Sequence, residues 1–255
     1  DSFSDGGEYN TYDQAMLKIE TMIKQGADVI DIGAESTRPG AQAISIETEV
    51  KRLEAVLKNY SSYFDCPLSI DTNKPEVAEF ALNNGAQIVN DITGFTKEKM
   101  VSTIAPYQPT VIVMHMQKMP KTMQVNPTYN DVVSEINTFF SKQINILDNA
   151  GINNIVIDPG IGFGKTLDHN IAIFKHLDKF KCLNKKILIG SSKKSFISMI
   201  TNESKDERLE GTIISHFLAL QKGANMLRVH DVVSAKKTIQ LFHAFRESLW
   251  LTLYL

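Results

Sequence analysis

Residues 155–165 read Ile-Val-Ile-Asp-Pro-Gly-Ile-Gly-Phe-Gly-Lys, a short apolar run that ends in a carboxylate and is followed by a glycine-rich turn. The apolar run predicts a buried strand from Ile155 to Asp158, and Pro159-Gly160 predicts the turn that ends it. The three glycines allow the backbone to approach a ligand or another segment closely. The carboxylate of Asp158 therefore stands at a strand end, where it can either hold a polar heterocycle or cap the following helix.

A phosphate-binding P-loop is an alternative interpretation of this stretch, because Gly164-Lys165-Thr166 matches the end of that motif. The P-loop pattern requires a glycine at position 159, where this sequence has proline. We therefore reject a P-loop.

The same succession of an apolar strand and a polar strand end recurs along the chain. Strands are predicted to begin near residues 28, 68, 87, 110, 155, 186 and 226, with helical patterns between them. Strands that alternate with helices predict a parallel sheet. A doubly wound sheet usually carries a glycine fingerprint after its first strand, and this sequence shows none, so we favour an α/β fold of the (β/α)8 TIM-barrel type. No linker or change of composition divides the chain, and we expect a single domain over residues 1–255.

An eight-stranded barrel needs one strand more than this pattern supplies. A barrel with a gap would expose two edges of unpaired backbone groups. We therefore expect the first barrel strand to be missing from this sequence and to precede Asp1.

Composition narrows the class of protein. The chain of 255 residues has a net charge of −2 and a pI near 6.3, which argues against a general nucleic-acid or membrane-surface binder. Its two cysteines, Cys66 and Cys182, lack metal-ligand spacing and favour a reducing, cytoplasmic location. No run of 18 apolar residues is present.

Polar residues collect at the predicted strand ends, which meet on one face of a barrel, the face that carries the site. They are Asp31, Asp71, Asn90, Asp91, His115, Asp158, Lys194, Arg228 and His230. Carboxylates and an amide suit a ring with N–H donors and a carbonyl, whereas the cationic groups suit an anion such as phosphate. The sequence has no HxH, HExxH or clustered Cys/His metal motif.

Several motifs in this order resemble dihydropteroate synthases over nearly the whole chain. They are DSFSDGG at 1–7, STRPG at 36–40, DTNKPEVA at 71–78, NDITG at 90–94, VMHMQ at 113–117, PKTMQ at 120–124, DPGIGFGK at 158–165, SSKKS at 191–195 and RVHDV at 228–232. The resemblance implies a transferase of folate biosynthesis, a target of sulfonamides. It would join p-aminobenzoate to 6-hydroxymethyl-7,8-dihydropterin diphosphate and release diphosphate.

The resemblance also implies roles for particular residues. Asp71, Asn90, Asp158 and Lys194 would hold the pterin; Thr37, Arg228 and His230 the diphosphate; Arg38, Pro39, Phe163 and Ser195 the p-aminobenzoate; and Phe3 and Asp5 would belong to a mobile loop. The expected partners are these small molecules and a second copy of the chain in a homodimer, with no nucleic acid and no membrane.

Two features depart from the family pattern. The family has an apolar strand and an Asn associated with Mg²⁺ just before DSFSDGG, so the expected metal ligand would lie upstream of Asp1. Lys193 stands where the family commonly has Arg, and Lys lacks the planar fork for a bidentate contact. Two other functions stay open, a pterin-dependent methyltransferase and a non-catalytic pterin-binding homologue.

Overall fold

The structure, a computed structural model, describes residues 11–35, 44–204 and 206–251. At its centre lies a parallel sheet of seven strands that pair in chain order. The strands are β1 (Ile30–Ile32), β2 (Leu68–Asp71), β3 (Ile88–Asp91), β4 (Thr110–Met114), β5 (Ile155–Asp158), β6 (Lys186–Ile189) and β7 (Met226–Leu227).

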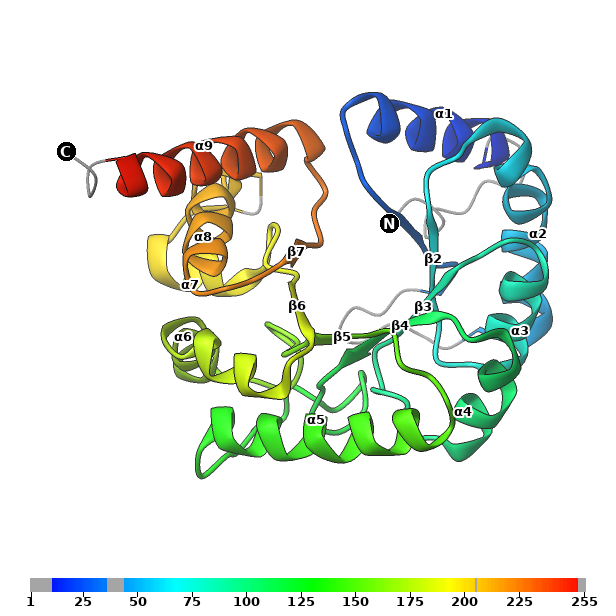
Figure 1. Cartoon of the computed structure of the whole chain (residues 1–255), viewed down its shortest axis with the longest axis horizontal. Coiled ribbons are helices and arrows are strands. Elements are labelled where there is room, and N and C mark those ends of the chain that lie inside the picture. Colours follow the sequence, from blue (N-terminus) through cyan, green and yellow to red (C-terminus); the bar gives the residue numbers. More distant parts are fainter. Residues whose placement is uncertain (1–10, 36–43, 205, 252–255) are drawn as a thin grey trace.

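Helices follow the strands and cover the outside of the curled sheet, as Figure 1 shows. They are α1 (Thr11–Lys24), α2 (Ile46–Tyr63), α3 (Pro75–Asn83), α4 (Glu98–Ile104), α5 (Val132–Asn149), α6 (Leu167–Lys175), α7 (Ser195–Thr201), α8 (Leu209–Gln221) and α9 (Val232–Leu251), with the 3-10 turns η1 (Ala105–Tyr107) and η2 (Leu177–Leu183). None of the helices in the described part of the chain is both long and apolar enough to cross a membrane.

The alternation of side chains along each strand divides the apolar residues between two cores. Outward-facing residues such as Val89, Val113 and Ile157 are fully buried in the large core under the helices. A separate inner cluster contains Ile88, Ile112, Val156 and Leu188, with Val29 and Met226 packed against it. The strands therefore bury both faces, which is typical of parallel sheets.

The predicted parallel α/β sheet is confirmed, and several boundaries differ from the expectation. In the sequence, the stretch from Met226 to Asp231 has the pattern of a strand, but β7 ends at Leu227. Arg228 N still donates to Ile189 O (3.0 Å), whereas His230 N lies 3.3 Å from the side-chain oxygen of Ser192, so a side chain replaces the neighbouring strand as partner. In the sequence, Asn73 and Pro75 indicate the start of a helix; α3 does begin at Pro75, but its N-cap is Lys74 and not Asn73.

Within the described residues, β1 pairs only with β2, and β7 pairs only with β6. These two strands form the edges of the curled sheet, with α1 on one side of the opening and α9 on the other (Figure 1).

Candidate functional site

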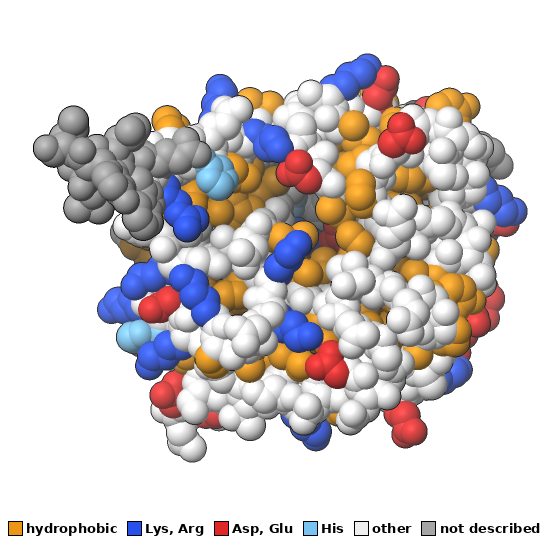
Figure 2. Space-filling view, viewed as in Figure 1, with side chains coloured by type: hydrophobic (Ala, Val, Ile, Leu, Met, Phe, Trp, Pro, Cys, Tyr) orange, Lys and Arg blue, Asp and Glu red, His pale blue; other side chains and the backbone are white. Residues whose placement is uncertain are grey.

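A ring of polar side chains lies directly above the inner apolar cluster. Two residues further along the strand from Val29, Ile88, Val156 and Met226, and hence on the same inner face, stand Asp31, Asn90, Asp158 and Arg228. Figure 2 shows this side of the molecule hollowed near its centre. The inner face of the sheet therefore changes from apolar to charged within a single step of two residues.

Arg228 joins two of these strands through ion pairs. Its Nε lies 2.7 Å from Asp31 Oδ2, and its Nη2 lies 2.6 Å from Asp71 Oδ2. Asn90 Nδ2 donates to the same Asp31 oxygen at 3.3 Å. One arginine, two carboxylates and one amide thus form a connected group across β1, β2, β3 and the end of β7.

Asp158 organises its own loop rather than the following helix. Its Oδ1 accepts a hydrogen bond from Gly160 N (2.8 Å), while α6 is capped by Thr166, whose hydroxyl accepts from His169 N. The interpretation of Asp158 as a helix cap is therefore wrong. The second carboxylate oxygen remains available for a ligand in the described part of the site.

Lys194 reaches into the same site from the loop after β6. Its ammonium donates to Ile161 O and lies 4.5 Å from the centroid of the Phe163 ring, a cation–π contact. Phe163 and Lys194, to which the family resemblance assigns different substrates, are therefore neighbours in the structure.

Beneath the loop that follows β5, a second lysine is fully enclosed. Lys165 Nζ has three acceptors nearby, His115 Nδ1 at 3.1 Å, His115 O at 3.2 Å and Phe163 O at 2.9 Å. These contacts account for all three N–H bonds of an ammonium group. Lys165 therefore ties the glycine-rich loop to the end of β4.

Two of the predicted strand-end residues point away from the site. Asp91 is fully buried and accepts hydrogen bonds from Thr93 and from Phe95 N, so it folds its own turn. His115 packs its ring edge-on against Phe139 of α5. Both follow an inward-facing residue directly, which places their side chains on the outer face.

Two further predicted residues, His230 and Ser195, are exposed, as is Lys193, which departs from the family pattern. His230 is exposed, and its Nδ1 lies 3.0 Å from Ser192 Oγ. Ser195 is exposed at the first position of α7. The backbone of Lys193 donates to Thr212 Oγ1 and accepts from Arg208 Nη1, and the residue is exposed.

Burial changes the protonation of the enclosed groups. Burial raises the pKa of Asp71 to about 6, with the Arg228 charge opposing the change, and it also raises the pKa of Asp158 against the nearby Lys194 charge. Burial lowers the pKa of Lys194 to about 8 and that of Lys165 to about 7. The neighbouring Asp31 carboxylate raises the pKa of Arg228, so its guanidinium stays charged.

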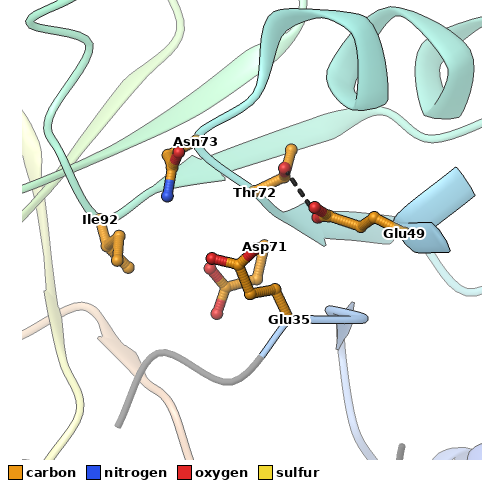
Figure 3. A pocket seen from close by; sticks show the side chains of 6 residues that line it. All are labelled: Glu35, Glu49, Asp71, Thr72, Asn73 and Ile92. Carbon is orange, nitrogen blue, oxygen red and sulfur yellow. Dashed lines mark hydrogen bonds between the residues drawn. The ribbon is translucent and has the colours of Figure 1, made fainter. Parts of the chain in front are cut away.

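A small cavity of about 10 Å³ lies beside Asp71. Its lining consists of Glu35, Glu49, Asp71, Thr72, Asn73 and Ile92, shown in Figure 3. Glu49 accepts a hydrogen bond from Thr72 Oγ1 (2.9 Å) and pairs with Lys74, which also pairs with Glu35. A cavity of this size has room for a single water molecule and not for a substrate.

Five predicted site residues, Phe3, Asp5, Thr37, Arg38 and Pro39, lie outside the described residues. The described ones contain no group of three or more His, Cys, Asp or Glu side chains that could hold a metal ion. Asp31 and Asp71 are both paired with Arg228. The described side chains therefore do not form a magnesium site by themselves.

Three residues that shape the site were not predicted from the sequence. Lys165 was considered only as part of a P-loop, Ser192 had no assigned role, and the Gln124 side chain donates to Gly162 O across the site loop. Gln124 is the last residue of the PKTMQ motif, and that motif was the available sign in the sequence that Gln124 has a role.

The fold and this inner polar ring fit the class of pterin-binding enzymes. The profile of the family described as pterin binding enzyme matches residues 1–230. A protein named dihydropteroate synthase from Escherichia coli (strain K12) is 40% identical over 246 residues, which cover 96% of this chain and 87% of that protein.

Solved structures give the same result. The Yersinia pestis dihydropteroate synthase with a sulfonamide drug complex has a TM-score of 0.91 at 38% identity and covers 97% of this chain and 90% of that chain. The dihydropteroate synthase from Thermus thermophilus in complex with 4-aminobenzoate has a TM-score of 0.83 at 38% identity, with 92% and 90% covered. The chain belongs to the dihydropteroate synthase family.

Proposed function

We infer that this chain is a dihydropteroate synthase of folate biosynthesis. It condenses p-aminobenzoate with 6-hydroxymethyl-7,8-dihydropterin diphosphate to give 7,8-dihydropteroate and diphosphate. The observation that carries this inference is the inner ring of Asp31, Asp71, Asn90, Asp158 and Arg228 above an apolar floor, in a chain whose relatives bear that name.

The pterin is assigned to the acidic side of the ring. Asp71, Asn90 and Asp158 offer buried carboxylate and amide groups to ring N–H donors and a carbonyl, and Lys194 adds a cation whose charge acts on Asp158. A charge-assisted hydrogen bond in such a dry site is stronger than a neutral one. This arrangement supports the expected pterin-binding roles.

The diphosphate is assigned to Arg228 and His230, with Thr37 beside them. The two ion pairs of Arg228 use Nε and Nη2, and a guanidinium has five N–H donors, so capacity for an anion remains. Mg²⁺ is proposed only as a companion of the diphosphate, because phosphate oxygens and water are its usual ligands. No step of the proposed reaction depends on it.

The p-aminobenzoate is assigned to the rim formed by Phe163 and Ser195, together with Arg38 and Pro39. The Thermus thermophilus relative whose structure holds 4-aminobenzoate supports this substrate. Phe163 adjoins Lys194, which is assigned to the pterin, so an aromatic ring bound there would lie next to the bound pterin. Phe3 and Asp5 are proposed as part of a loop that excludes water.

The proposed reaction begins with cleavage of the C–O bond between the pterin methylene and the diphosphate. The bond's electron pair leaves with diphosphate, which Arg228 and His230 hold, and the carboxylates of Asp71 and Asp158 stabilise the positive charge spread over the dihydropterin ring. The amine of p-aminobenzoate then attacks the methylene carbon and loses a proton. No protein nucleophile takes part.

Two alternatives from the sequence have less support. A pterin-dependent methyltransferase would share the pterin site, and a non-catalytic homologue would bind pterin diphosphate without releasing diphosphate. The Escherichia coli, Yersinia pestis and Thermus thermophilus relatives are all named as synthases. An assay that detects incorporation of p-aminobenzoate would exclude the methyltransferase function. An assay that detects release of diphosphate would exclude the non-catalytic function.

The larger assembly is also proposed. An eighth strand between β1 and β7, from outside the described residues, would complete a TIM barrel within the proposed single domain. A homodimer through the last helices would cover exposed apolar residues there, among them Ile214 and Leu218 of α8 and Leu241 and Phe245 of α9. The exposed free thiol of Cys182 suits the proposed cytoplasmic location.

The role of Arg228 provides the test of these assignments. Titration of the Arg228→Ala variant with bare 6-hydroxymethylpterin and with its diphosphate is expected to show a loss of at least tenfold for the diphosphate and a small loss for the bare pterin. Equal losses for the two ligands would contradict the assignment of Arg228 to the diphosphate.

A further inference from the structure

Asp31 is the one member of the inner ring to which the family resemblance assigned no role. It lies in the middle of β1, with its side chain 17% exposed, and its register partner on β2 is Ser69. Its carboxylate is therefore one strand away from Asp71 and two strands away from Asn90.

A single oxygen of Asp31 serves two neighbours. Oδ2 pairs with Arg228 Nε at 2.7 Å and accepts from Asn90 Nδ2 at 3.3 Å. Arg228 belongs to the proposed diphosphate side of the site, and Asn90 to the proposed pterin side. Oδ1 is buried and has no hydrogen-bond partner among the described residues.

The contact with Nε restricts Arg228 more than one ion pair would. Asp71 Oδ2 also lies 2.6 Å from Nη2. A planar guanidinium with ion pairs at two different nitrogens cannot rotate without breaking one of them. The contact with Nδ2 likewise fixes which way the Asn90 amide faces, so that its oxygen is presented away from Asp31.

We propose that Asp31 is a positioning residue that sets the placement of the diphosphate-binding arginine relative to the pterin-binding amide. The inference rests on the proposed function, since the two halves belong to one substrate only if that substrate is a pterin diphosphate. In this proposal Asp31 acts through Arg228 and Asn90 rather than by its own contact with the substrate. A small displacement of groups that align a substrate can lower the reaction rate strongly.

The simplest competing role for Asp31 is charge balance. Three carboxylates, those of Asp31, Asp71 and Asp158, face the cations Arg228, Lys194 and Lys165 in this region. If Asp31 only balanced charge, its hydrogen-bond geometry would not matter. The variants must therefore separate charge from geometry.

Asp31→Asn and Asp31→Ala make this separation. An asparagine can still accept from Arg228 and Asn90 through its oxygen, and its NH2 would take the place of Oδ1, which has no partner to lose in the described part. Alanine removes both contacts. The matched control is Asp28→Ala, which removes a carboxylate just before the same strand, where Asp28 is 82% exposed and pairs with Lys236.

For kcat/KM toward the pterin diphosphate, we expect a loss of about 100-fold in Asp31→Ala, about tenfold in Asp31→Asn and none in Asp28→Ala. KM for p-aminobenzoate and the melting temperature should stay close to those of the unmodified chain. Equal losses in the Asn and Ala variants would show charge balance and overturn the proposal. A parallel loss of stability and of every ligand would overturn it as well.

The decisive experiment asks whether the effect of Asp31→Ala on affinity depends on the presence of Arg228 and Asn90. It is measured by calorimetric titration with 6-hydroxymethylpterin diphosphate, which requires no turnover. In an Arg228→Ala/Asn90→Ala background, adding Asp31→Ala should change affinity by less than about twofold, because the residues through which it acts are gone. An undiminished loss in that background would contradict the proposal. Failure of the unmodified chain to turn over would refute the synthase assignment and leave this binding comparison valid.

Discussion

At the scale of single residues, Asp158 combines two contacts that one substitution can separate. Its Oδ1 holds Gly160 N, and the rest of the carboxylate faces the site. An asparagine retains an oxygen for Gly160, so it keeps the turn and loses only the charge. The fold of the loop and the recognition of the pterin therefore become independent observables.

We expect Asp158→Asn to weaken binding of a pterin analogue about 10- to 100-fold, since a hydrogen bond to a charged group contributes about 1.5–3 kcal/mol. Isothermal titration measures this loss, and circular dichroism should show unchanged melting. Unaltered affinity would mean that Asp158 serves only its own loop.

The lowered pKa of Lys194 leads to a prediction of how pterin binding depends on pH. Burial lowers its pKa to about 8, so the ammonium is present below that pH and is lost as pH rises through it. Affinity for the pterin should therefore fall above pH 8. In Lys194→Arg the charge persists, because arginine stays protonated, and the alkaline decline should disappear.

The matched control is Lys99→Arg, which changes an exposed lysine paired with Glu76 on the surface. Its pH profile should match that of the unmodified chain. An alkaline decline that survives in Lys194→Arg would assign it to another group.

Asn90 and Asp91 show how far the site residues could be predicted from the sequence. Both are polar, both follow the apolar pair Ile88-Val89, and the sequence cannot say which of the two faces inward. The structure puts Ile88 in the inner cluster, so Asn90 shares its face and Asp91 turns outward. The register of β3 against its neighbours decides this, and that register is a property of the whole sheet.

At the scale of elements, the site depends on how the loop after β5 packs against the end of β4. Gly160 has φ +68°, and a Cβ added there would lie 2.1 Å from His115 O. Tyr129 donates to Gly164 O (2.8 Å) and Gln124 to Gly162 O, so the long segment between β4 and α5 supports the same loop. Both segments carry motifs that are visible in the sequence, PKTMQ at 120–124 and DPGIGFGK at 158–165, but the sequence did not predict that they lie against each other.

Gly160→Ala is expected to displace this loop and to abolish most of the pterin affinity, with a fall in melting temperature. Gly85→Ala is the matched control, because Gly85 also has positive φ (+94°) but nothing within 4 Å of an added Cβ. The control should show only the cost of backbone strain, about 1 kcal/mol, and normal binding. Equal behaviour of the two variants, by melting and titration, would contradict the importance of the close approach at Gly160.

Helices α7 and α8 lie between β6 and β7, where the sequence predicted helical structure without giving its bounds. Helix α7 has only seven residues, too few to display a clear period, and α8 carries the exposed apolar residues Ile214 and Leu218 on its outer side. The sequence of α8 therefore lacks the clear polar face by which an amphipathic helix is recognised. An interface with a second copy, as proposed, would explain an apolar outer face.

At the scale of the whole molecule, parallel strands in chain order place every strand end at one side of the sheet. That arrangement was predictable from alternating strands and helices, and it was enough to gather the candidate residues. It could not predict that Arg228 reaches across the inner face to Asp31 and Asp71, because that contact spans the opening between β7 and β1. The ion pairs join the first and last strands of the described sheet through side chains.

The measurement that tests the central claim most directly is the release of diphosphate by the purified chain supplied with 6-hydroxymethyl-7,8-dihydropterin diphosphate, with and without p-aminobenzoate. The account predicts that release requires p-aminobenzoate and that one dihydropteroate forms for each diphosphate, with Arg228→Ala losing at least 100-fold in rate because the leaving group is no longer held. Tight binding of the pterin diphosphate with no release of diphosphate in the presence of p-aminobenzoate would contradict it.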